Sequence, residues 1–159
     1  LLEMGTVKAL GAGCTCPAHS VVKALMRHLV VERNEVVILD MEAGIEHLGR
    51  GTVEHVDVLL AVADANQKSL AIAATICQLA QGSKIPTVGL VANRIATSRQ
   101  LEIVRSFSQE RHIPLLGTIP YDPGVAEAGM TGAPVDPAHS SAMDAIKGLA
   151  AALEAGHAG

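Results

Sequence analysis

The sequence predicts a single three-layer α/β domain, in which helices cover a mostly parallel sheet on both faces. Two observations carry this prediction. Apolar, β-branched runs alternate with stretches whose apolar residues recur at helical spacing, which is typical of parallel βαβ units. Each run is apolar almost throughout, as a strand covered on both sides should be. With 159 residues, 49% of them hydrophobic, the chain can bury one core, and we expect one domain over residues 1–159.

Four runs are expected to form the strands, and they are residues 35–40, 56–64, 86–93 and 113–120. The stretches with helical spacing are 21–29, 70–80, 101–107 and an alanine-rich tail from Ser140 to about Ala155. Ser69 and Ser98 are predicted to cap two of these helices at their N-termini. Cys77 falls on an apolar helix position, so we expect it in the core.

Composition and charge exclude several classes of protein. The net charge is −4 without a basic cluster, and aromatic residues make up 1% of the chain, so we expect no nucleic-acid partner. No apolar run approaches the roughly 20 residues of a membrane span, and we expect a cytoplasmic protein. Three cysteines are too few for a secreted disulfide scaffold.

Chemistry in an open parallel sheet lies at the carboxyl ends of the strands. The first run ends in Asp40, and Gly44 follows four residues later. In P-loop NTPases such an aspartate holds the Mg²⁺ shell, and such a glycine lets a backbone N–H approach the γ-phosphate. A strand end followed by an ordinary turn explains the same pattern, and both interpretations stay open at this point.

Two later strand ends add further candidates. Asn93 leaves its strand with an amide that can pair with a nucleobase edge. After the last strand, Pro120 and Pro123 stiffen a loop in which Asp122 or Gly124 can face a base or a ribose. Each of these strand ends is weak evidence alone. Their order along one parallel sheet makes a nucleotide site at its carboxyl edge a stronger interpretation than any one of them does.

Cys14 and Cys16 form a Cys-x-Cys motif between glycines and a proline. In an extended chain, side chains at i and i+2 project to the same side, so both thiolates can reach one ion. Tetrahedral Zn²⁺, or a soft site for Ni²⁺, requires four ligands. A twofold homodimer would provide Cys14 and Cys16 from each copy, and so all four ligands. The alternative is that two small residues fill a loop beside Gly11 and Gly13.

Four stretches resemble a known family. "VVILDMEAGIEHLGRGT" resembles the switch region of the MinD-like, deviant-Walker P-loop NTPases, and its second half is most similar to that of the CooC-type nickel-insertion ATPases, which mature carbon monoxide dehydrogenase. "GTVKALGAGCTCP" is similar to the strand and Cys-x-Cys segment of that family. "VANRI" and "IPYDPGVAEAG" are similar to its adenine-side loops.

This resemblance implies a role for each candidate. Asp40 would be the Walker B carboxylate and Gly44 the switch II glycine. Asn93 would contact adenine together with a loop formed by Pro120, Tyr121 and Asp122. The implied cofactors are ATP or ADP with Mg²⁺, and Zn²⁺ or Ni²⁺ at Cys14 and Cys16; the implied partners are the carbon monoxide dehydrogenase apo-enzyme and a second copy of the chain.

The sequence departs from the family in one respect, because no stretch matches G-x-x-x-x-G-K-[ST]. That loop supplies most of the phosphate binding, so we expect the 159 residues to be the C-terminal portion of such a domain and inactive as an ATPase alone. Two alternatives remain. One is a MinD- or ParA-like ATPase that positions a partner, and the other is a non-catalytic domain that dimerises through metal.

Overall fold

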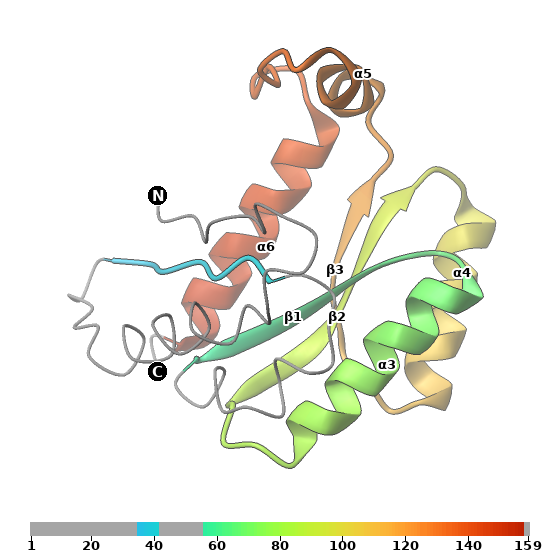
Figure 1. The fold of residues 1–159 in the computed structure, drawn as a ribbon, viewed down its shortest axis with the longest axis vertical. Coiled ribbons are helices and arrows are strands. Elements are labelled where there is room, and N and C mark those ends of the chain that lie inside the picture. Colours follow the sequence, from blue (N-terminus) through green and yellow to red (C-terminus); the bar gives the residue numbers. More distant parts are fainter. Residues whose placement is uncertain (1–34, 42–55, 158–159) are drawn as a thin grey trace, which may run out of the picture.

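The computed structural model describes residues 35–41 and 56–157, and within them a three-stranded parallel sheet (Figure 1). The strands are β1 (Val58–Asp64), β2 (Thr87–Ile95) and β3 (Leu115–Pro120), hydrogen-bonded in the order β1-β2-β3. Helix α3 (Gln67–Gln81) links β1 to β2, and α4 (Ser98–Glu110) links β2 to β3. Helices α5 (Pro123–Thr131) and α6 (Ser141–His157) follow β3. The predicted βαβ order is therefore confirmed for three of the four runs.

The helices lie on both faces of the sheet. Helices α3 and α4 pack against β1 and β2 on one side, and α6 packs against β3 on the other (Figure 1). This is the three-layer α/β arrangement that the sequence predicts.

The main core lies between the sheet and α3 with α4. Its buried members come from β1, β2, α3, α4 and the α4–β3 connection: Ala61, Ala63, Leu70, Ala73, Ala74, Cys77, Leu90, Ala92, Val104 and Ile113. The small side chains on β1 and α3 let the helix approach the strand closely. Cys77 is buried here as predicted, and burial raises the pKa of its thiol, so it behaves as a small apolar residue.

The segment 35–41 is the exception to the predicted sheet. It forms no strand in the structure, and Val36 and Ile38 are 72% and 87% exposed. Only Met41, at its end, packs against the small cluster of Ala80 and Ile85, close to where β2 begins. The predicted strand over 35–40 is therefore wrong for the described structure. An apolar run indicates a tendency to be buried, but a strand also needs a neighbour for its backbone hydrogen bonds.

The helix starts also differ from prediction. Asn66 caps α3 and Thr97 caps α4, whereas Ser69 and Ser98 lie inside those helices. The Thr97 hydroxyl and the Gln100 side chain form a reciprocal capping box, which fixes the start of α4 at Thr97. Helix α5 was expected as a loop; Pro123 in its first turn and Asp122 as its N-cap are ordinary helix-start signals that the sequence already contains.

At the amino end of the sheet, Gly89 of β2 has no space for a side chain. A Cβ on Gly89 would lie 2.7 Å from the backbone oxygen of Pro114 and 2.6 Å from Cγ of Leu116. The pairing of these strands shifts register between Leu90 and Val91. Glycine is required at residue 89 because the Leu116 side chain and the Pro114 backbone, just before β3, fill the space of a side chain.

Candidate functional site

The carboxyl ends of the three strands meet at one edge of the sheet, as they must in a parallel sheet. Asp64 and Asn93 are paired residues at the ends of β1 and β2. The third strand joins them there, since Ile95 pairs with Pro120 and accepts a hydrogen bond from the Tyr121 backbone N–H at 3.0 Å. The predicted proximity of Asn93 and the Pro120–Asp122 loop is therefore seen in the structure.

A cavity of about 590 Å³ opens at this edge, between the end of β2, the β3–α5 connection and α6. Asn93, Arg94 and Asp122 contribute its polar groups. The remaining wall is mostly apolar: Ile119, Pro120, Tyr121, Val125, Met130, Val135, Met143 and Ile146. Apolar walls with a few convergent polar groups are typical of small-molecule sites, and the volume accepts a flat heterocycle with room to spare.

Asp122 lines this cavity, but its carboxylate is engaged with the protein. One oxygen, Oδ1, accepts the backbone N–H groups of Gly124 at 2.9 Å and Val125 at 3.2 Å, in the first turn of α5. The other, Oδ2, accepts the Ser140 hydroxyl at 2.8 Å and the Ala142 N–H at 3.2 Å, at the start of α6. One buried carboxylate thus caps two helices, a role that is not predicted from the sequence.

These hydrogen bonds also set the acidity of Asp122. The Ser140 hydroxyl and then the Ala142 N–H stabilise the charged form, and together with the α5 N–H groups they lower the pKa of Asp122 to about 2. The carboxylate is therefore ionised at any physiological pH. Its contact with a nucleotide, expected from the sequence, stays a prediction.

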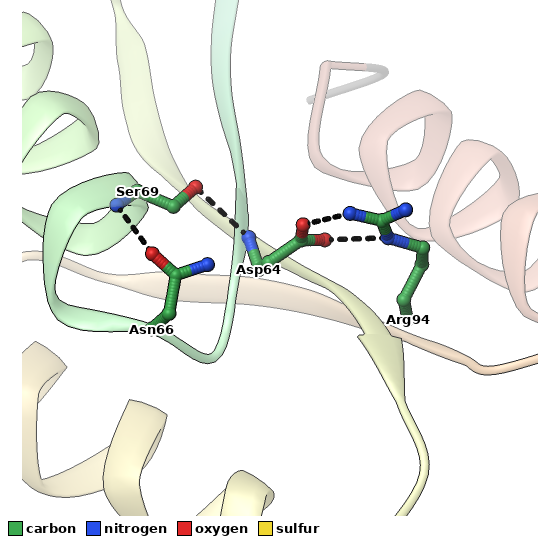
Figure 2. A network of polar contacts seen from close by, with 4 residues as sticks. All are labelled: Asp64, Asn66, Ser69 and Arg94. Atoms are coloured by element: carbon green, nitrogen blue, oxygen red, sulfur yellow. Dashed lines mark hydrogen bonds and ion pairs between the residues drawn. The ribbon is translucent and has the colours of Figure 1, made fainter.

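A second network connects Asp64 to Arg94 (Figure 2). The Arg94 guanidinium donates through Nε to Asp64 Oδ1 at 3.0 Å and through Nη2 to Oδ2, a two-point pairing of planar groups. The backbone N–H of Asp64 donates to the Ser69 hydroxyl at 3.1 Å, and the N–H of Ser69 donates to Asn66 Oδ1 at 2.9 Å. This network ties the ends of β1 and β2 to the start of α3.

Arg94 stands where β2 stops being regular. Its φ of 53° lies in the left-handed region, and the pairing of β2 with β3 shifts between Ala92 and Ile95. The ion pair lowers the pKa of Asp64, chiefly through the hydrogen bond from Arg94. The sequence does not predict this pair: both side chains are polar residues at strand ends, but nothing in the sequence marks a left-handed arginine.

Three predicted site residues, Cys14, Cys16 and Gly44, lie outside the described residues. Asp40 lies in the segment 35–41, exposed and outside the sheet, so its role as a Walker B carboxylate stays a prediction.

Within residues 35–41 and 56–157, no group of three or more His, Cys, Asp or Glu side chains is placed to hold a metal ion. None of the helices in the same ranges is long and apolar enough to cross a membrane.

No protein-family model matches the sequence. Curated relatives cover most of it. The chain is 40% identical over 153 residues to the carbon monoxide dehydrogenase accessory protein CooC of Rhodospirillum rubrum. This alignment covers 96% of this chain and 57% of that protein. It is also similar to two uncharacterized ATP-binding proteins of Methanocaldococcus jannaschii. One is 40% identical over 136 residues and the other 32% identical over 137 residues, covering 86% and 85% of this chain.

The chain spans about half the length of the curated relatives it matches, between 53% and 57% for these three. The matched region includes nearly every residue discussed above, because the alignment to the accessory protein leaves out only 4% of this chain. The resemblance predicted from the sequence is confirmed: along almost its whole length, this chain is similar to the carbon monoxide dehydrogenase accessory protein CooC of Rhodospirillum rubrum.

Proposed function

We propose that the protein containing this chain is a nucleotide-dependent accessory protein that delivers nickel to carbon monoxide dehydrogenase. The observation that carries this proposal is the cavity at the carboxyl edge of the sheet, because it unites Asn93 with the Pro120–Asp122 connection. The similarity to an accessory protein of that enzyme supports the target, and the similarity to ATP-binding proteins supports the ligand.

The cavity suits a purine base better than a phosphate chain. Its wall is largely apolar, as a flat ring requires, and the Asn93 amide offers both a donor and an acceptor to the edge of a base. In this proposal ATP or ADP, with Mg²⁺, places its base here. Asp40 and Gly44 act on the phosphates, and Asp40 supplies an oxygen ligand to the Mg²⁺ shell.

The nucleotide part is tested by replacing the Asn93 amide in the intact protein. Asn93→Ala is expected to weaken ATP binding about tenfold, since one to two hydrogen bonds to the base are lost. Gln109→Ala is the matched control, because it removes another side-chain amide on the exposed surface of α4. Calorimetric titration with Mg·ATP measures both; equal affinities for Asn93→Ala and the wild type would refute the base site.

The 159 residues by themselves should bind Mg·ATP only weakly and should not hydrolyse it. Contacts to the base are few, and the sequence contains no phosphate-binding loop of the form G-x-x-x-x-G-K-[ST]. Micromolar binding with turnover by this chain alone would contradict the proposal that phosphate binding needs such a loop.

The metal part of the proposal assigns one Zn²⁺ or Ni²⁺ ion per homodimer to Cys14 and Cys16. Two thiolates from each copy give four ligands, and thiolate is a soft ligand suited to either ion. Because thiols must lose their protons to bind, acidification or a strong chelator should dissociate both metal and dimer.

Sedimentation combined with metal analysis tests this assignment on Cys14→Ser/Cys16→Ser. The double variant is expected to be monomeric and free of metal, and to fail to support nickel activation of the dehydrogenase apo-enzyme. Cys77→Ala is the matched control, because it removes a buried thiol remote from the motif in sequence and keeps both predicted ligands. A double variant that dimerises and carries metal like the wild type would refute the assignment.

A further inference from the structure

The residue next to Asn93 has an unusual backbone. Arg94 has a φ of 53°, which side-chain-bearing residues adopt rarely, and it lies at a register shift between β2 and β3. The regular pairing of β1 with β2 ends at Asn93, and pairing with β3 resumes at Ile95. The direction in which the Asn93 side chain points therefore depends on how this irregular residue is held.

Arg94 is held by Asp64. The guanidinium presents two parallel N–H groups to the carboxylate, so the pair fixes an orientation as well as a distance. A lysine at residue 94 would keep the charge but lose this two-point geometry.

Asp64 is in turn anchored to a rigid element. Its own N–H bonds to the Ser69 hydroxyl in the first turn of α3, whose N-cap is Asn66 (Figure 2). Asp64 is also the pairing partner of Asn93 on β1. The Asp64 carboxylate thus binds Arg94, the residue after its pairing partner Asn93. Through Asp64, the irregular backbone at Arg94 is connected to the start of α3.

We propose that Asp64 and Arg94 form a positioning pair, which aims the Asn93 amide into the cavity and thereby sets selectivity for the base. This inference rests on the proposed nucleotide function. The Arg94 side chain lines the cavity, but the pair acts through Asn93, and Asp64 is not among the cavity residues.

Arg94→Lys and Arg94→Gly in the intact protein test the pair. The first keeps the charge and makes the same backbone demand as the wild type, and the second accepts the left-handed backbone without strain, so a folding defect shared by both variants is not expected. Both are expected to lower the ratio of ATP to GTP affinity about five- to tenfold. His112→Gly is the matched control: His112 also has a φ of 53°, lies in the α4–β3 connection, and should leave the ratio unchanged.

A double-variant comparison separates positioning from general stability. In an Asn93→Ala background, Arg94→Lys should have no further effect on the affinity ratio, because the group that it positions is gone. Additive losses, or a wild-type ratio in both Arg94 variants, would overturn the positioning pair. If Asn93→Ala itself leaves affinity and ratio unchanged, the proposed base site fails instead, so the two failures are distinguishable.

Discussion

The two ends of the sheet are stabilised in different ways. At the amino end, Gly89 has no room for a methyl group because Leu116 and Pro114 occupy that space, and the small cluster of Ala80 and Ile85 packs nearby. At the carboxyl end, two carboxylates accept hydrogen bonds: Asp122 from two helix starts and Asp64 from Arg94. The amino end is therefore sensitive to shape, whereas the carboxyl end is sensitive to charge and carries the cavity.

The largest effect on stability is expected from the amino end. Gly89→Ala should lower the free energy of unfolding by about 2–3 kcal/mol, since the new Cβ meets the backbone of Pro114 and that backbone must move. Chemical denaturation measures the loss. Gly148→Ala, in α6, is the matched control: its Cβ meets nothing within 4 Å, and replacing a helical glycine should stabilise by about 0.5–1 kcal/mol.

Asp122→Asn should give the next largest loss, a decrease of several degrees in the thermal midpoint. The amide loses the charge and offers a single acceptor oxygen, so one of the two helix starts loses its partner. Differential scanning calorimetry measures the midpoint. Asp136→Asn is the control, because its carboxylate bonds only within an exposed loop. Equal midpoints for the two variants would mean that Asp122 does not hold α5 and α6.

Acid should weaken the carboxyl end selectively. The pKa of Asp122 is about 2 in the folded protein and 3.8 as its ordinary value, so the folded state resists protonation of this group. Its contribution to stability is complete above about pH 4 and is lost as the pH falls through about 2. Urea midpoints at pH 5, 4, 3 and 2 should therefore converge for the wild type and Asp122→Asn. A constant gap between them across this range would contradict the assignment.

The smallest effect on stability is expected from Arg94→Gln. The Arg94 side chain is 66% exposed, and exposed ion pairs contribute little because water and salt screen them. Its thermal midpoint should stay within a few degrees of the wild type, and the difference should shrink further in 1 M salt. A loss as large as that of Asp122→Asn would make the Asp64–Arg94 pair structural and remove the distinction between the two carboxylates.

Much of the fold was accessible from the sequence because burial is periodic. The β1, β2 and β3 runs and the stripe of α3 are apolar at the spacing of their elements, and their order predicts the parallel sheet. Residues 35–40 show the limit of this reasoning, since an apolar run does not specify its pairing neighbour. Helix α5 was missed although Asp122 and Pro123 mark its start, because the apolar pattern around them is weak.

The site was predictable only as far as topology decides it. Asn93 and Tyr121 line the same cavity because parallel strands end at one edge. The engagement of Asp122 by Ser140 depends on a contact across 18 residues, and the bend at Arg94 depends on a backbone conformation that arginine seldom adopts. Neither follows from local preference, so both required the three-dimensional arrangement.

The double cap at Asp122 joins the opening motions of two helices. When the first turn of either α5 or α6 unwinds, the same carboxylate loses partners, and the other helix start is left with a weakened anchor. Amide hydrogens at the two starts should therefore exchange with solvent at correlated rates, as one cooperative unit. Because residues of both helices line the cavity, we expect this unit to govern how readily a ligand enters and leaves the proposed base site.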